Sequence, residues 1–250
     1  RVHPRCGCAQ GGVRVSFQRR AASELGRRDH ARWLGSSRYA GGAPLTLPTT
    51  NLLAAYDARV GVTNVSGACS AWADQSGNGY HASQGTAGAR PTISTSDGYA
   101  SLLFDGTADW LSVPSMALSA GGTRTVYSVV KQVATSGTRI VFYVGSTPVF
   151  YCGHQTNYIM YDGTFRDSGI ALNTAMCRLT CEATAGASQV WRDGTAGAAR
   201  GYSTLPAASG TRGIGGAGGD YFSGHILAIF IYEAARNTAV EAYITQEWGV

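Results

Sequence analysis

The sequence is poor in charged residues and has almost no lysine. Charged residues make up 14% of the chain, Lys131 is the one lysine, and 34 of the 250 residues are glycine. A helical bundle needs many Lys and Glu side chains on its surface, so this composition disfavours one. Short strands joined by tight turns use glycine and aromatic residues, and aromatics make up 10% of the chain. We therefore expect one all-β domain with an extension.

Long apolar runs and a dense cysteine pattern are also missing. No stretch approaches the roughly 20 apolar residues of a membrane span, and the N-terminus lacks the apolar core of a secretory signal. Six cysteines in a chain this long are too scattered for a disulfide framework, so we expect free thiols. Their spacing also differs from the usual zinc knuckle. They are Cys6, Cys8, Cys69, Cys152, Cys177 and Cys181.

Positive charge is concentrated in the first 40 residues. They hold nine arginines against Glu24 and Asp29, whereas the rest of the chain has 11 basic and 13 acidic residues. We interpret residues 1–48 as a basic arm and linker, and residues 49–250 as the folded domain. The arm is expected to dock on an acidic protein or nucleic acid, with a solvated tail as the alternative. The arginines expected to anchor it are Arg14, Arg19, Arg20, Arg27, Arg28 and Arg32.

From Leu52 onward, short runs rich in Val, Ile, Tyr, Phe and Thr are separated by turn dipeptides, a pattern typical of strands. Asp97-Gly98, Asp105-Gly106, Asp162-Gly163 and Asp193-Gly194 are pairs that accept positive φ in a tight turn. Regular spacing of these units favours an antiparallel β-sandwich with jelly-roll topology. The expected strands include 101–104, 125–133, 139–144, 158–161 and 189–191.

The C-terminal region changes period. A nearly continuous apolar run at 225–232 predicts a buried strand, and a helical pattern follows it. Thr238 with Glu241 three residues later predicts a capping box, and Gly249 predicts the end of the helix. The helix should dock on the sandwich through one face, which makes its tryptophan part of the core. That face consists of Val240, Tyr243, Ile244 and Trp248.

Several segments carry a family resemblance. They are LAAYDA at 53–58, WADQSGNGYHA at 72–82, LFDG at 103–106 and DWLSV at 109–113. Together with the closing strand and helix, they resemble the laminin G-like, concanavalin A-like modules of bacterial surface and phage virion proteins. The resemblance spans about Leu52 to Val250 and implies a concanavalin A-like sandwich. One departure is Ala228, which stands where the family often has a glutamate.

Catalytic patterns are missing from the sequence. Glucanases that share this sandwich carry Glu-x-Asp-x-Glu on one strand, because acid and nucleophile must face the same bond. That spacing is absent, and Glu182 is the one glutamate in the strand-rich region. Asp105 and Asp109 are closely spaced, but the first is expected to cap backbone amides in a glycine turn. We therefore expect no enzyme.

Two kinds of binding site are candidates. Asp57, Asp74 and Asn78 offer oxygen ligands for calcium, with turn-stabilising hydrogen bonds as the alternative role. Sugar binding needs exposed aromatic rings beside polar groups at loop tips, although each such ring could equally be packed. The candidates for sugar binding are Tyr80, Trp110, Tyr158, Tyr202 and Tyr221.

The first functional expectation is a structural or display protein of a virion, as a capsid decoration, fibre or tail component. The arm would anchor it to other virion or surface-assembly proteins, and the sandwich would face outward and engage glycans. A glycan-binding lectin that is free or at the cell surface, with or without calcium, is the alternative, and a glycoside hydrolase is a third. The expected location is the virion surface, the cell surface or the extracellular space. A homo-oligomer is compatible with the sequence.

Overall fold

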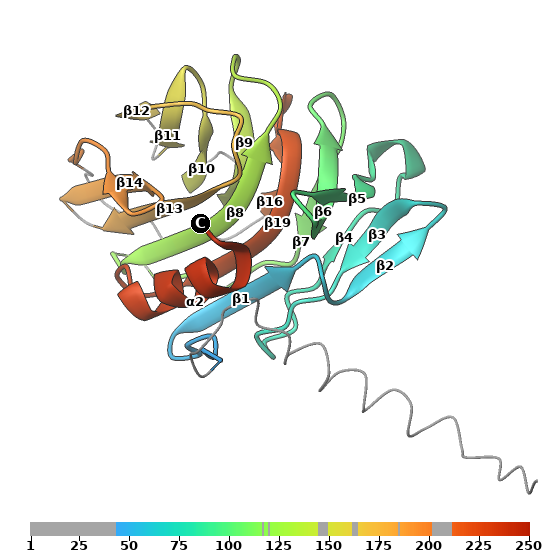
Figure 1. Cartoon of the computed structure of the whole chain (residues 1–250), viewed down its shortest axis with the longest axis horizontal. Coiled ribbons are helices and arrows are strands. Elements are labelled where there is room, and N and C mark those ends of the chain that lie inside the picture. Colours follow the sequence, from blue (N-terminus) through green and yellow to red (C-terminus); the bar gives the residue numbers. More distant parts are fainter. Residues whose placement is uncertain are drawn as a thin grey trace, which may run out of the picture. The chain divides into compact units, whose positions relative to one another are not determined.

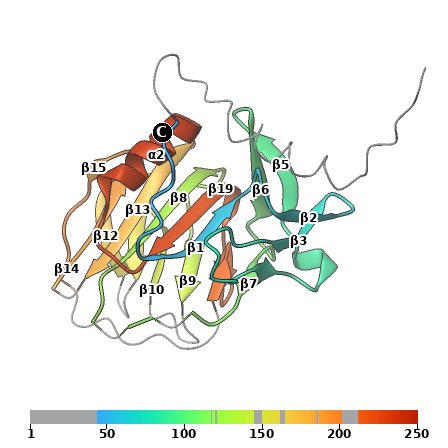
Figure 2. The same cartoon turned by 90° about the horizontal axis from the view of Figure 1, so that it is seen from below.

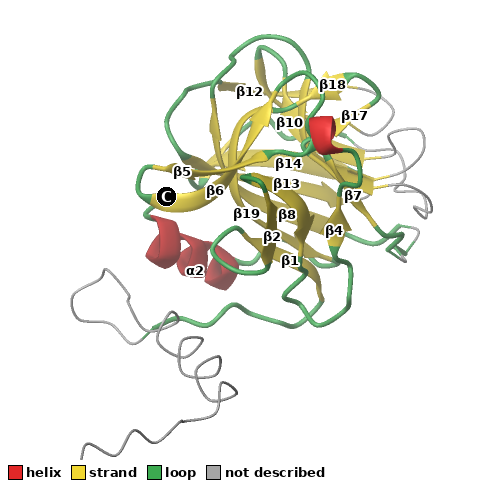
Figure 3. Ribbon diagram, turned by 90° about the vertical axis from the view of Figure 1, so that its right-hand side faces the viewer, coloured by secondary structure: helices red, strands yellow, loops and turns green. Residues whose placement is uncertain are grey.

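The computed structural model describes residues 44–250 except for 117, 120, 145–149, 162–164, 185 and 202–211. Residues 45–250 form one compact unit. Strands predominate in it, and the helix α2 (Thr238–Trp248) lies at their side (Figure 3). The fold is an antiparallel β-sandwich that ends in a short helix, which confirms the predicted fold class.

The first sheet is built around β19 (Ser223–Tyr232), which is the predicted apolar strand. The other strands of this sheet are β1 (Leu52–Asp57), β5 (Thr92–Ser96), β6 (Tyr99–Asp105), β8 (Arg124–Gln132), β13 (Cys177–Thr184), β14 (Ala187–Arg192) and β15 (Thr195–Ala196). β8 pairs with one edge of β19, whereas β6 and β1 share the other edge. The blue strand β1 and the red strand β19 therefore lie side by side (Figure 1).

The second sheet has the order β12-β11-β10-β9-β16-β7-β4-β3-β2. Its strands are β2 (Val62–Val65), β3 (Ala68–Trp72), β4 (Ala82–Ser83), β7 (Leu111–Val113), β9 (Arg139–Val144), β10 (Phe150–His154), β11 (Asn157–Tyr161), β12 (Phe165–Ala171) and β16 (Arg212–Ile214). A pairing of Ala68 with Thr92 connects the two sheets. Two small elements complete the described part: the 3-10 turn η1 (Ala87–Ala89) and the hairpin of β17 (Gly216–Ala217) and β18 (Asp220–Tyr221).

The main hydrophobic core lies between the two sheets. Leu179 of β13 and Ile229 of β19 come from the first sheet, and Phe142 of β9 and Met160 of β11 come from the second. All four side chains are buried. Strand residues alternate between the two faces of a sheet, so β13 supplies every second side chain to this core, namely Cys177, Leu179, Cys181 and Ala183.

A second apolar layer covers the outer face of the first sheet. Val240, Ile244 and Trp248 of α2 pack against Tyr127 and Phe230 of the strands beneath. Figure 2 shows α2 on this outer side, next to β13 and β8. The predicted helix and its docking face are therefore confirmed, and Trp248 belongs to the core.

The predicted capping box of α2 is wrong by one residue. The N-cap is Asn237, whose Oδ1 accepts a hydrogen bond from Ala239 N at 2.9 Å. The Glu241 carboxylate pairs instead with Arg236 Nη2 at 2.6 Å. Asn and Thr are both good N-cap residues, so the sequence alone could not decide between Asn237 and Thr238. The ion pair of Glu241 with Arg236 decides between them. Gly249 ends the helix as predicted, with a left-handed φ of 76°.

Two predicted hairpin turns are confirmed by their backbone geometry. Asp97-Gly98 has φ values of 51° and 83°, and Asp193-Gly194 has φ values of 50° and 82°. Both residues of a type I′ turn need positive φ, which Asp and Gly accept at low cost. Asp162-Gly163 lies outside the described residues. The described cysteines are buried free thiols, namely Cys69, Cys152, Cys177 and Cys181.

The folded unit begins earlier than the sequence indicates. Leu45 N donates to Gln246 Oε1 of α2 at 2.6 Å, and the Tyr232 hydroxyl donates to Pro48 O at 2.6 Å. Residues 45–48 therefore pack on the sandwich and are not linker. Within the part of the chain that the structure describes, no helix has the length and apolarity of a transmembrane span. The arm arginines Arg14, Arg19, Arg20, Arg27, Arg28 and Arg32 lie outside the described residues, as do Cys6 and Cys8.

Candidate functional site

Aromatic residues occupy one cross-strand row on the second sheet. Tyr143 of β9 is paired with Tyr151 of β10, which is paired with Tyr161 of β11, which is paired with Phe165 of β12. Tyr143 and Tyr161 belong to an apolar cluster separate from the main core, so they lie on the outer face of the sheet. We call these four positions the aromatic row. At about 4.8 Å per strand, the row extends roughly 14 Å across the sheet.

A second row of mostly apolar residues runs beside the aromatic row. Ile140 is paired with Gly153, which is paired with Ile159, and Ile159 is paired with Asp167. Ile140 and Ile159 are buried. A Cβ at Gly153 would collide with the carbonyl oxygen of Arg139, so glycine is required for the close approach of β9 and β10. These residues form an apolar floor for the outer face.

The exposure of the aromatic row increases toward β12. Tyr143 is 8% exposed and its ring lies against Gly213 of β16, whereas Phe165 is 47% exposed. Tyr161 is partly buried, and its ring centroid lies 5.2 Å from that of Phe165 at an interplanar angle of 66°. Burial raises the pKa of Tyr143, with a smaller contribution from Tyr221. Of the three side chains of the row that the structure describes, Tyr161 and Phe165 are therefore the more accessible.

Polar groups border the accessible pair. Asp167 Oδ2 accepts a hydrogen bond from Asn157 Nδ2 at 3.1 Å, and its Oδ1 accepts one from Gly169 N at 2.7 Å. Beside β12, Arg200 Nε donates to the carbonyl oxygen of Asp167 at 2.8 Å. Aromatic surface beside fixed hydrogen-bonding groups suits a ligand that has one apolar face and polar edges.

The β17–β18 hairpin lies beside β9, at the buried end of the row. Tyr221 is partly buried there, and Arg139 Nη1 donates to its carbonyl oxygen at 3.0 Å. Burial raises the pKa of the neighbouring Asp220, and the charge of Arg139 opposes that shift. Of the five aromatic residues predicted as sugar ligands, Tyr221 is the one that the described structure places near the aromatic row.

Tyr158, one of the candidate sugar ligands, is packed in the protein interior, which was the alternative for each candidate ring. It is 1% exposed and its hydroxyl lies 3.3 Å from Cys177 Sγ in the main core. Tyr161, three residues later on the same strand, points to the opposite face because side chains alternate. The side chains on both faces of β11 are apolar, so composition could not show which tyrosine points outward.

The other predicted aromatic ligands are not brought together. Tyr80 and Trp110 lie next to β4 and β7, with β16, β9 and β10 between them and the exposed end of the row. Both are partly buried, and Tyr80 packs against the main core. Gln84 Nε2 donates to the carbonyl oxygen of Trp110 at 2.9 Å, which fixes that loop. Tyr202 lies outside the described residues.

The predicted calcium ligands are engaged by protein groups. Asp74 accepts hydrogen bonds from the amides of Ala55, Ser76 and Tyr80, at 2.9–3.0 Å, and from the Ser76 hydroxyl at 2.8 Å. Asn78 Nδ2 donates to two carbonyl oxygens of β1, and the Asp57 carboxylate pairs with Arg59 at 2.6 Å. Among the described residues, no group of three or more His, Cys, Asp or Glu side chains could hold a metal. These contacts favour the turn-stabilising role.

Replacing Asp74 with asparagine is expected to lower the free energy of unfolding by about 2 kcal/mol. The amide NH2 of asparagine would face one of the donors that the carboxylate now accepts from, and a hydrogen bond to a charged group is worth about 1.5–3 kcal/mol. Urea unfolding of both proteins measures this difference. We expect calcium to leave the urea midpoint of the wild-type protein unchanged. A bound cation would raise that midpoint, so a rise would show that the protein binds calcium.

Two further clusters bear on catalysis. Although partial burial opposes the shift, hydrogen bonds from Thr107 and three backbone amides lower the pKa of Asp105 to about 2. Burial and the charge of Asp105 raise the pKa of Asp109 to about 6. Asp105 therefore caps the turn, as predicted. Ser101 Oγ lies 3.0 Å from His225 Nδ1, but Ser101 is 1% exposed, so its hydroxyl does not reach a substrate in this arrangement.

No family model matches the chain, and no curated protein matches it. Several solved structures do match the chain. Domain 4 of AbnA, a GH43 extracellular arabinanase from Geobacillus stearothermophilus in complex with arabinotriose, is 14% identical with a TM-score of 0.57, over 76% of this chain and 97% of that one. Trypanosoma rangeli sialidase in complex with sialic acid is also 14% identical with a TM-score of 0.57, over 89% of this chain.

The binding domain of botulinum neurotoxin DC in complex with SialylT is 10% identical with a TM-score of 0.54, over 80% of this chain and 51% of that one. The chain spans 38% of the length of the sialidase. At these identities the likeness concerns the fold, and it agrees with the β-sandwich described above.

Proposed function

We propose that this chain is a glycan-binding module that uses the exposed part of the aromatic row. The observation that carries the proposal is the Tyr161–Phe165 pair, which is accessible on the outer face of the second sheet beside Asn157 and Asp167. A sugar ring has one face of C–H groups that stacks on an aromatic ring and hydroxyls that reach polar groups at its edge. Solved structures of similar fold include proteins in complex with arabinotriose and with sialic acid, which supports this class of ligand.

The proposed module binds without catalysis. Asp105 and Asp109 are used to order a turn, and Ser101 is buried beside His225. The display role on a virion remains a prediction from the sequence, because the arm on which it rests lies outside the described residues. Membership of the laminin G-like, concanavalin A-like family, which is finer than the β-sandwich fold, is likewise part of this proposal.

Truncating either ring of the exposed pair is expected to weaken glycan binding about tenfold, which corresponds to about 1.4 kcal/mol. The measurement is a glycan array with the wild-type protein, followed by calorimetric titration of the best ligand into Tyr161→Ala and Phe165→Ala. Both rings stand on the solvent side of the sheet, so thermal unfolding should change little.

Two variants serve as controls. Val133→Ala removes an apolar side chain that is 61% exposed elsewhere and should leave binding unchanged. Trp110→Ala tests the loop next to β7 that the sequence proposed. If Trp110→Ala abolished binding and the two row variants did not, the site would lie at that loop. A wild-type protein that retained no glycan would refute the function itself.

A further inference from the structure

Arg200 is fixed beside β12, next to the exposed end of the aromatic row. Its backbone is paired with Ser188 of β14, with Arg200 N donating to Ser188 O at 2.8 Å and Ser188 N donating to Arg200 O at 2.7 Å. Ala198 N donates to Ser168 O at 2.8 Å, so the segment before Arg200 connects β14 with β12. The side chain is therefore positioned by two strands.

The guanidinium of Arg200 has no acidic partner among the described residues. Its Nε donates to the Asp167 carbonyl oxygen, and the residue is exposed. The carboxylate of Asp167, whose carbonyl oxygen Arg200 contacts, accepts hydrogen bonds from Asn157 Nδ2 and Gly169 N instead. Among the residues that the structure describes, no carboxylate therefore forms an ion pair with Arg200.

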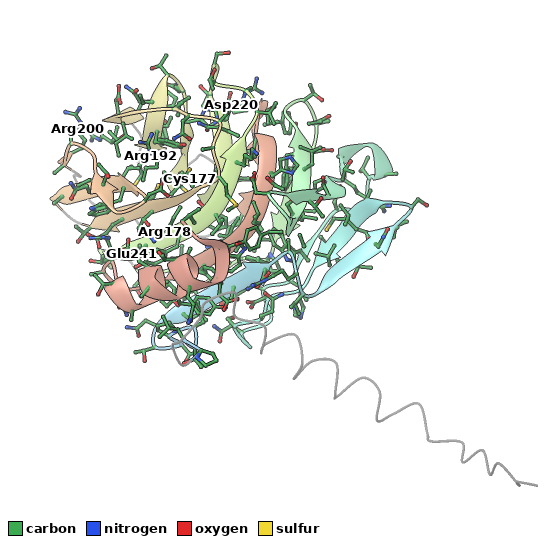
Figure 4. All side chains as sticks on the ribbon, in the orientation of Figure 1. Cys177, Arg178, Arg192, Arg200, Asp220 and Glu241 are labelled. Carbon is green, nitrogen blue, oxygen red and sulfur yellow. The ribbon has the colours of Figure 1, made fainter. Side chains whose placement is uncertain are left out.

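A second arginine extends to the same strand. Arg192 Nη1 donates to the carbonyl oxygen of Ala171, at the end of β12, at 2.9 Å. Its ion pair with Asp193 is long, at 3.9 Å, and partly exposed, so it neutralises little of the charge. Figure 4 shows Arg192 and Arg200 on the β12 and β14 side of the molecule. Two arginine side chains thus border this edge of the site.

We propose that the glycan is acidic and that a sugar carboxylate binds the guanidinium of Arg200. This inference rests on the proposed function. Asp167 follows Phe165 by two residues, so the anchor of Arg200 lies about 7 Å along the strand from the ring position. A sugar stacked on Phe165 can therefore place an exocyclic carboxylate at Arg200. An arginine fork held by its Nε keeps its two terminal nitrogens for a carboxylate, which it binds with matching planar geometry.

The test compares acidic and neutral forms of the same glycan on the full chain. The probes are sialyllactose against lactose, and oligogalacturonate against its methyl ester, titrated at low salt and at 0.5 M NaCl. We expect the wild-type protein to bind at least one acidic probe about tenfold more tightly than its neutral partner. The preference should shrink at high salt, because an exposed ion pair is screened.

Arg200→Gln should remove this preference and leave the weaker binding of the neutral probe, whereas Arg200→Lys should restore part of it. Arg90→Gln is the matched control, because Arg90 also donates to backbone carbonyls, those of Gln84 and Gly85, at 2.9 Å each, on a loop next to β4. It should keep the full preference. Thermal unfolding of each variant shows whether the fold is intact.

The inference and the function fail in different ways. The carboxylate site would be overturned if neutral and acidic probes bound equally well. It would also be overturned if Arg200→Gln kept the preference for acidic probes. In both cases the glycan-binding function would stand. A preference for a sulfated over a carboxylated probe would also overturn it. If the wild-type protein bound none of the probes and no member of a glycan array, the proposed function itself would fall.

Discussion

Truncation of Trp248 to alanine is expected to lower the free energy of unfolding by about 3–5 kcal/mol. Trp248 is 1% exposed, and its ring centroid lies 5.9 Å from that of Phe230 on β19. The guanidinium of Arg59 lies 4.3 Å from the same ring, and it pairs with Glu247 and Asp57 at 2.6 Å each. Removal of the ring would leave a cavity between α2 and the first sheet and would leave Arg59 without its aromatic contact.

Equilibrium urea unfolding measures this loss, and Trp248→Phe separates packing from polar effects. Because the indole Nε1 has no hydrogen-bond partner among the described residues, phenylalanine should recover much of the stability. Ala242→Gly, at an exposed position of α2, should cost only about 1 kcal/mol. A loss in Trp248→Ala no larger than this control would show that α2 contributes little to the stability of the sandwich.

Acidification is expected to destabilise the protein through His154 by about 3 kcal/mol between pH 7 and pH 4. His154 is 1% exposed in the main core and its ring packs against Phe222. Neither ring nitrogen makes a hydrogen bond of standard geometry with the residues that the structure describes. Burial lowers the pKa of His154 to about 4, opposed by a contact with the Gln155 backbone and assisted by the charge of Arg139. The unfolded chain takes up this proton near pH 6.5, so stability is lost as the pH falls from 6.5 toward 4.

His154→Leu should remove this pH dependence, because leucine fills the site without a titrating group. The quantity to compare is the drop in unfolding free energy from pH 7 to pH 4 in the two proteins. Asp109, with its raised pKa of about 6, opposes the trend, because the folded state binds its proton more tightly. That contribution is common to both proteins and cancels in the difference. Equal drops in both proteins would contradict the role assigned to His154.

Much of the fold could be predicted from the sequence because local signals and tertiary structure agree. The apolar run at 225–232 lies within β19, and the 3.6-residue period of apolar residues predicted α2. Two of the Asp-Gly pairs predicted tight turns that the structure contains. The errors arose where two neighbouring signals had equal strength. Asn237 and Thr238 are both good caps, and Leu45 carries no sign that its amide would bind Gln246.

The candidate site was harder to predict, because it depends on register. Tyr143, Tyr161 and Phe165 are separated in sequence, and they form one row only once β9 to β12 are paired in their observed alignment. A shift by one residue would turn Tyr158 outward and Tyr161 inward. Tyr161 ends β11 and Phe165 begins β12, on either side of the Asp162-Gly163 pair in the sequence, so turn residues next to an aromatic could have indicated both rings. The register that places them in one row with Tyr143 could not be read from that criterion.

The central place of β19 has a consequence for biosynthesis. β1, β6 and β8 all use it as a partner, yet it is made after every one of them. While the ribosome is still translating the middle of the chain, these three strands have open edges that invite mispairing with other nascent chains. The sandwich can therefore close only once residue 232 has left the exit tunnel, and a chain that stalls before residue 223 has no route to the native state.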